Sequence, residues 1–66
     1  MKIVREKYVI ATKEQPYKFD DGDGYNVDYI EEAYLYDDRE DAERILKTFD
    51  IPNDYHILKI RVIYEI

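Results

Sequence analysis

The stretch Ala33–Phe49, in the middle of the chain, contains a helix signal that constrains the fold more than any other feature of this sequence. Either Asp37 or Asp38 can cap the helix, and with Asp37 in that position Glu40 completes a capping box. Further acidic residues follow in the first turns, where they oppose the positive end of the helix dipole. Because Pro52 cannot continue a helix, we expect it to end near Asp50. The apolar face, at helical spacing, consists of Ala42, Ile45, Leu46 and Phe49.

Three other segments have the composition of strands. Lys2–Lys13 is rich in β-branched and aromatic residues. In Tyr55–Ile66, apolar side chains at even-numbered positions from Leu58 onward alternate with a mixed set of charged and apolar side chains at odd-numbered positions. A polar loop with both glycines occupies Glu14–Asn26. Val27–Tyr36 then regains strand character, although its apolar residues fall on both faces and need a bulge near Glu31.

This order of elements predicts an α+β fold, strand–strand–helix–strand. The strands form a three-stranded antiparallel sheet in the spatial order 2-1-3, and one helix covers one face with a right-handed crossover. A chain of 66 residues supports one small domain, so residues 1–66 are expected to fold as a unit. The residues expected beneath the helix are Val4, Tyr8, Ile10, Leu58, Ile60, Val62 and Tyr64.

The other face of the sheet is expected to stay open. It would be either solvated surface or a nucleic-acid contact, although a net charge of −6 disfavours direct nucleic-acid binding. The second and third strands are sheet edges, and the open face is apolar enough to pair through Ile3, Val9, Ile57 and Ile63. The chain could therefore also be a self-associating module, as in a homodimer. The expected members of this face are Arg5, Lys7, Lys59 and Arg61, beside Val9, Ile57 and Ile63.

Acidic residues are concentrated in one part of the chain. From Asp20 to Glu43 eleven acidic residues face one base, Arg39, so this segment carries −10 and the remainder +4. Such a block is either a solvated face that keeps a small protein soluble or an electronegative surface for a basic partner.

The residue inventory disfavours catalysis, and we expect a protein that is not an enzyme and has no cofactor. The chain has no serine, no cysteine and one histidine, His56. Asp21, Asp23 and Glu32 have the spacing of calcium-loop positions, but Tyr25 and Asn26 replace a required ligand and the turn glycine. A weak calcium contact is an alternative to the flexible acidic loop that we predict. The absence of cysteine and of a membrane span fits a cytoplasmic protein.

Eight tyrosines are too many for the interior of so small a protein. Tyrosine offers a large contact area at low entropic cost, and carboxylates interleaved with its rings suit a partner that presents arginine and lysine. We therefore predict a partner-binding surface for a basic protein that itself binds nucleic acid. Its residues are Asp20, Asp21, Asp23, Tyr25, Asp28, Tyr29, Glu31 and Glu32, extended by Asp38, Asp41 and Glu43.

The layout of the chain resembles that of many small bacteriophage proteins. The resemblance rests on Lys7–Ile10, on Ala33–Tyr36 running into Asp38–Leu46, and on the alternating C-terminal strand. Small acidic phage proteins include inhibitors of bacterial defence, among them anti-CRISPR proteins and DNA mimics that occupy nucleic-acid channels. The resemblance thus implies an inhibitory role, with no particular target.

Overall fold

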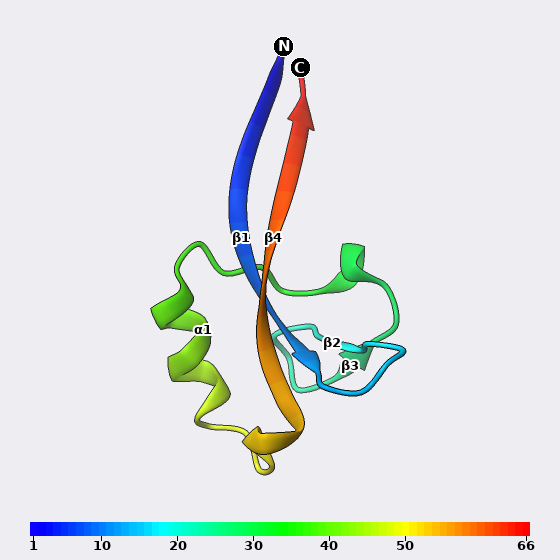
Figure 1. Cartoon of the computed structure of the whole chain (residues 1–66), viewed down its shortest axis with the longest axis vertical. Helices are drawn as coiled ribbons and strands as arrows, with labels where there is room; N and C mark the ends of the chain where they lie inside the picture. The colour runs from blue at the N-terminus through cyan, green and yellow to red at the C-terminus, as the bar shows by residue number, and fades with distance from the viewer.

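The two ends of the chain form one long antiparallel ribbon. In the computed structural model, which describes residues 1–66, β1 (Lys2–Thr12) pairs along its whole length with β4 (Tyr55–Glu65), and the two termini lie side by side at one end of the ribbon (Figure 1). The β-branched and aromatic side chains of both segments favour this extended pairing. The sequence-based prediction of both strands, and of their antiparallel contact, is confirmed.

Two short strands enlarge the sheet on the other edge of β1. β2 (Phe19–Asp20) pairs with β1, and β3 (Asn26–Val27) pairs with β2, which gives the order β3-β2-β1-β4. The α+β class with one helix and an antiparallel sheet is therefore confirmed, whereas the expected number of three strands is wrong. The loop expected at residues 14–26 contains β2.

The strand expected over residues 27–36 does not form. After β3 the chain turns through η1 (Ile30–Glu32) and then makes a single antiparallel bridge, in which the backbone of Tyr36 exchanges two hydrogen bonds of 2.8 Å with that of Tyr8. The physical reason lies in the apolar residues of this segment, which fall on both parities, so that no strand register could bury them on one face.

α1 (Arg39–Leu46) is shorter than expected and begins after Asp38. Asp38 makes no side-chain capping hydrogen bond, and Asp37 instead accepts a hydrogen bond from the ammonium group of Lys7, so the predicted capping box is wrong. The α-helix ends at Leu46, and residues 47–50 form turns and bends before Pro52, which opens η2 (Pro52–Asp54). Neither α1 nor any other helical segment is long and apolar enough to cross a membrane.

One part of the hydrophobic core lies between α1 and one face of the ribbon. Ile10 and Ala42 are completely buried and form a cluster with Tyr36. The half-buried residues that pack against this cluster are Tyr8, Leu46, Phe49, Tyr55 and Ile57. Ala42, Leu46 and Phe49 of the predicted apolar stripe thus face the sheet, as expected, whereas Ile45, its fourth member, has 40% of its surface exposed. Val9 and Ala11, on the opposite face of β1, are also completely buried, so the expectation that this second face stays open is wrong at these positions.

The register of the ribbon overturns the predicted division of the two faces. Every β1–β4 pair joins an even-numbered residue to an odd-numbered one, as in Ile10 with Ile57. Directly paired residues share a face, so Ile57 lies under the helix while Leu58 and Ile60 lie on the opposite face. The predicted basic face is divided for the same reason: Arg5 and Lys7 share one face, and Lys59 and Arg61 lie on the other.

Candidate functional site

The segment between β2 and α1 exposes tyrosine rings among carboxylates. Tyr25 and Tyr29 have 69% and 67% of their surface exposed. Asp23 in the loop before β3 and Glu31 and Glu32 in η1 are exposed as well. We call these five residues the acidic–tyrosine surface.

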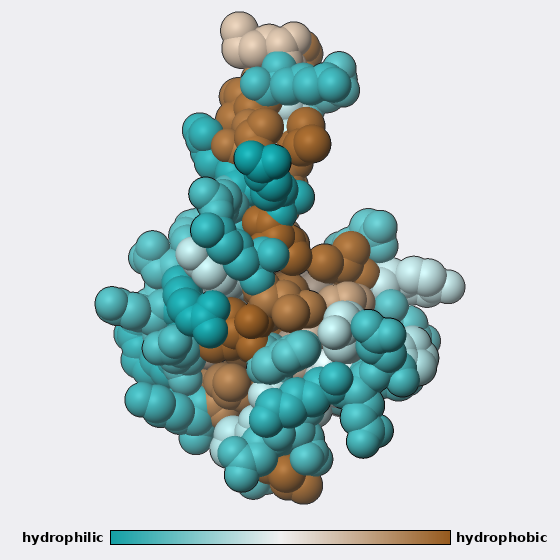
Figure 2. Space-filling model, viewed as in Figure 1, coloured by the Kyte–Doolittle hydropathy of each residue, from teal (hydrophilic) through white to brown (hydrophobic).

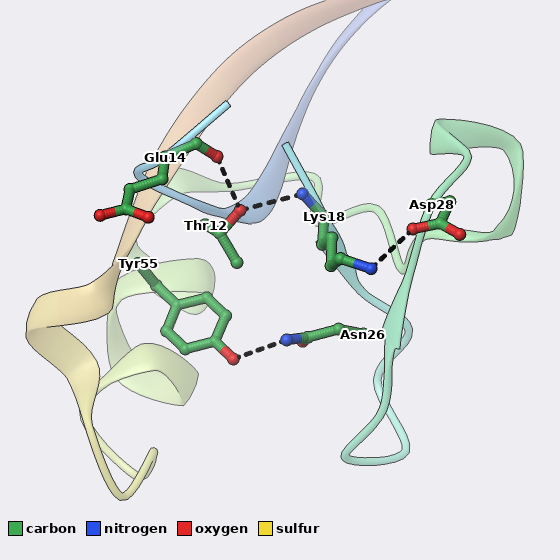
Figure 3. Close-up of polar contacts among 6 residues, drawn as sticks. All are labelled: Thr12, Glu14, Lys18, Asn26, Asp28 and Tyr55. Carbon is green, nitrogen blue, oxygen red and sulfur yellow. Dashed lines mark hydrogen bonds and ion pairs between the residues drawn. The ribbon is translucent and has the colours of Figure 1, made fainter. Parts of the chain in front are cut away.

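The carboxylates of this surface have no basic partner in the chain. Asp23, Glu31 and Glu32 make no ion pair, whereas Asp28 pairs with Lys18 at 2.9 Å (Figure 3). Free carboxylates beside exposed rings can accept arginine and lysine side chains from a partner.

The side-chain carboxylate of Asp21 holds the loop between β2 and β3 in shape by accepting backbone hydrogen bonds. Its Oδ1 accepts hydrogen bonds from the amides of Asp23 at 2.8 Å and Tyr25 at 3.2 Å, so this carboxylate serves the fold of the loop. Gly22 and Gly24 have positive φ angles of 87° and 93°, which glycine adopts without strain.

Replacing Gly22 by alanine is expected to destabilise the protein more than replacing Gly24. Both variants force a side chain into the left-handed region, at about 1–2 kcal/mol. A Cβ on Gly22 would also lie 2.9 Å from Cδ2 of Tyr34, whereas a Cβ on Gly24 meets nothing within 4 Å. We expect Gly22→Ala to cost about 1–3 kcal/mol beyond Gly24→Ala in urea unfolding. Equal midpoints for the two variants would contradict the packing of Tyr34 on this loop.

Polar contacts fasten the acidic–tyrosine surface to the ribbon (Figure 3). The side chain of Asn26 donates to the hydroxyl of Tyr55 at 2.9 Å, which ties β3 to β4. The hydroxyl of Thr12 accepts from the amide of Lys18 at 2.9 Å, and Lys18 reaches Asp28. An open, mostly polar depression of about 440 Å³ lies beside these contacts, lined by Thr12, Lys13, Glu14, Asn26, Asn53, Asp54 and Tyr55.

The acids of α1 and those of η1 lie on different sides of the ribbon (Figure 1), whereas the loop between β2 and β3 approaches the helix, since Gly22 and Ile45 line one depression. Figure 1 shows α1 on one side of the β1–β4 ribbon and β2, β3 and η1 on the other. Two of the predicted helix acids are paired within the helix, Asp41 with Arg44 and Glu43 with Arg39 at 3.1 Å, and Asp38 stands at its N-terminus. The structure thus separates the acids of η1 from those of α1, while Asp23 lies in the loop between β2 and β3.

Asp20 is the one predicted contact residue that is withdrawn from the surface. It ends β2 with 5% of its surface exposed and accepts a hydrogen bond from the amide of Gly22 at 3.2 Å. Burial raises the pKa of this carboxyl, and the negative charges of Asp21 and Asp23 raise it further, against the lowering effect of the Gly22 amide. A charge at Asp20 therefore costs folding free energy.

Replacing Asp20 by asparagine is expected to raise the melting temperature at pH 7. The folded chain binds a proton to Asp20 at higher pH than the unfolded chain, so ionisation of Asp20 reduces stability as pH rises above about 4. The asparagine side chain keeps an oxygen for the Gly22 amide and has no charge, so the gain over wild type should vanish near pH 4. Thermal unfolding monitored by circular dichroism between pH 4 and 7 measures the difference. The exposed Asp23→Asn is the matched control and should give a smaller gain; a lower melting temperature for Asp20→Asn at pH 7 would contradict this account.

The structure assembles no site for the alternatives that the sequence analysis weighed, a role for His56 in catalysis and calcium binding. His56 packs edge-on against Tyr17 with ring centroids 5.4 Å apart, and its Nε2 is buried without a hydrogen-bond partner. No three acidic or histidine side chains come together in a geometry that could hold a metal ion, the calcium-loop candidates Asp21, Asp23 and Glu32 included. The basic side chains of the sheet are partly engaged: Lys59 pairs with Glu6 at 2.6 Å, an interaction that lowers the pKa of Glu6 and raises that of Lys59.

Sequence reasoning missed the residues that position the surface. Thr12, Lys18 and Tyr55 make its anchoring contacts, yet none stood out in the sequence. Asn26 and Tyr55 are 29 positions apart, and no local pattern encodes a contact over that separation.

No protein-family model, curated protein or solved structure matches this chain.

Proposed function

We propose that the chain is a small binding protein that inhibits a basic, nucleic-acid-handling protein by covering its basic surface. The observation that carries this proposal is the acidic–tyrosine surface, where Tyr25 and Tyr29 are two-thirds exposed. Each lies within three residues in sequence of an unpaired carboxylate, that of Asp23, Glu31 or Glu32. Rings and free carboxylates are the groups that bind guanidinium and ammonium ions. The inhibitory role is the one that the resemblance to small phage proteins implies.

The contact surface of this proposal is narrower than the acidic block of the sequence. Asp20 is buried, Asp21 organises the loop, and Asp28 is paired with Lys18. The helix acids lie on the other side of the ribbon (Figure 1) and are outside the proposed contact. We assign recognition to the five residues of the acidic–tyrosine surface, with no catalytic step.

Affinity capture tests the proposal. The tagged protein is incubated with a nuclease-treated bacterial lysate, and the column is washed with rising salt. We expect one or a few basic nucleic-acid-binding proteins to be retained at low salt and to elute as salt increases, because exposed charge pairs are screened. Retention that is insensitive to salt, or of no basic protein, would count against the proposal.

Self-association is a second candidate function. The free end of the β1–β4 ribbon (Figure 1), where apolar side chains are exposed, favours it.

A further inference from the structure

The free end of the β1–β4 ribbon projects from the body as an arm. We define the arm as residues 1–7 and 60–66, beyond the bridge between Tyr8 and Tyr36 (Figure 1). No other strand lies beside it. Apolar side chains remain exposed there, including Ile63 at 59% and Val4 at 46%, and Figure 2 shows apolar patches between hydrophilic ones along the arm. A lone two-stranded ribbon is marginally stable in water, so a second layer would stabilise this one.

The strand register gives the arm two faces of different character. Val4 pairs with Ile63, and on the same face lie the flanking pairs Lys2–Glu65 and Glu6–Arg61. We call these six residues the Val4–Ile63 face. The opposite face, formed by Ile3, Arg5, Lys7, Ile60, Val62 and Tyr64, has basic residues as its only charged residues.

We propose that a second copy of this chain covers the Val4–Ile63 face, the two arms stacking antiparallel about a two-fold axis at the level of Val4 and Ile63. β1 then lies over β1 of the second copy. Lys2 of each copy meets Glu6 of the other, and Glu65 of each meets Arg61 of the other. The four central side chains, Val4 and Ile63 from both copies, form a small apolar core between the two ribbons.

Charge complementarity identifies the occupant as a copy of the same chain. Lys2, Arg61 and Glu65 have no ion-pair partner in their own chain, whereas Glu6 pairs with Lys59 at 2.6 Å and offers Lys2 of a second copy its remaining carboxylate oxygen. The antiparallel stack supplies a partner of opposite charge to each of them, and a two-fold interface repeats every contact. Stacking through the opposite face would instead offer Arg5, which has no ion-pair partner, no carboxylate of the second copy's arm, since Lys7 is the only other charged residue there and is paired with Asp37.

The position of α1 selects the antiparallel arrangement. α1 packs over Tyr8, Ile10 and Ile57, which continue the Val4–Ile63 face into the body. A parallel stack would place the two helices in the same space, whereas an antiparallel stack overlaps only the arms and leaves a body at each end. Because only the arms overlap, we expect a buried area at the low end for a specific interface, so the dimer should dissociate on dilution.

Sedimentation equilibrium from about 10 to about 500 µM, a range suited to a weak interface, tests the proposal. The wild-type mass should rise from 8.1 kDa at the lowest concentration towards twice that value at the highest. The double variant Lys2→Glu/Glu65→Lys keeps the net charge and the opposite charges across the ribbon, but it sets like charges against Glu6 and Arg61 of the second copy. We expect this variant to stay at 8.1 kDa throughout.

A second variant tests the apolar centre. Val4→Thr/Ile63→Thr keeps β-branched residues in both strands and removes apolar contact, so it should also remain monomeric. Circular dichroism establishes that each variant retains the wild-type fold. A wild-type mass that stays at 8.1 kDa would overturn the proposal. Full association of the charge-swapped variant, which a parallel stack would permit, or of the threonine variant, which pairing through strand edges would permit, would overturn it as well. The proposal is independent of the acidic–tyrosine surface.

Discussion

Replacing Ile10 by alanine is expected to remove about 2–5 kcal/mol of folding free energy, the usual cost of a cavity at a fully buried aliphatic residue. Ile10 in β1 is completely buried between the β1–β4 ribbon and α1 and forms one cluster with Tyr36 and Ala42. A domain of this size has a total stability on the order of 3–10 kcal/mol, so the variant should be partly unfolded at room temperature. Urea unfolding followed by circular dichroism measures the loss.

Ile51→Ala is the matched control because the same atoms are removed from a side chain that is 59% exposed. We expect its free energy of unfolding to stay within about 0.5 kcal/mol of wild type. A cost below about 1 kcal/mol for Ile10→Ala would contradict the position of the core.

The second large effect is expected in binding. Neutralising the acidic–tyrosine surface with Asp23→Asn, Glu31→Gln and Glu32→Gln should weaken binding to a captured partner about 100-fold, at about 1 kcal/mol for each carboxylate. These three side chains are exposed and make no ion pair, so the substitutions leave the fold unchanged. Isothermal titration calorimetry at low salt provides the dissociation constants.

The control removes the same number of charges from the acids of α1. Asp38→Asn, Glu40→Gln and Glu43→Gln keep a good capping residue at position 38 and break only the exposed Glu43–Arg39 pair. This variant should bind within a few-fold of wild type. Equal losses for the two triple variants would show that total charge, and not the acidic–tyrosine surface, determines affinity.

The two long strands and the helix could be predicted because local patterns encode them. Alternation along β4, β-branched residues in β1 and the apolar spacing of α1 each depend on neighbours a few positions away. The register between β1 and β4 joins residues up to 63 positions apart, Lys2 with Glu65. Apolar residues occur at both even and odd positions of β4, so the sequence allowed either set to face the helix. The wrong choice placed Leu58, and not Ile57, under the helix.

The candidate site was predictable in its composition and not in its geometry. Exposed tyrosines and carboxylates between β2 and η1 follow from their number, since so small a core cannot hold them. The burial of Asp20 depends on packing near Tyr36, whose pKa is raised chiefly by its own burial and further by the charge of Asp20. Glu32 and Asp38 are close in sequence, yet the chain passes along the ribbon at Tyr36 between them and so separates the acids of η1 from those of α1.

The central claim of the proposed function is that the acidic–tyrosine surface covers the basic surface with which its partner binds nucleic acid. The most direct measurement is competition: a fluorescently labelled oligonucleotide is bound to the captured partner, and its anisotropy is followed as this protein is added. We predict that wild type displaces the oligonucleotide, that the Asp38/Glu40/Glu43 variant does so equally, and that the Asp23/Glu31/Glu32 variant requires far higher concentrations. An anisotropy that stays high while wild-type protein demonstrably binds the partner would contradict the claim.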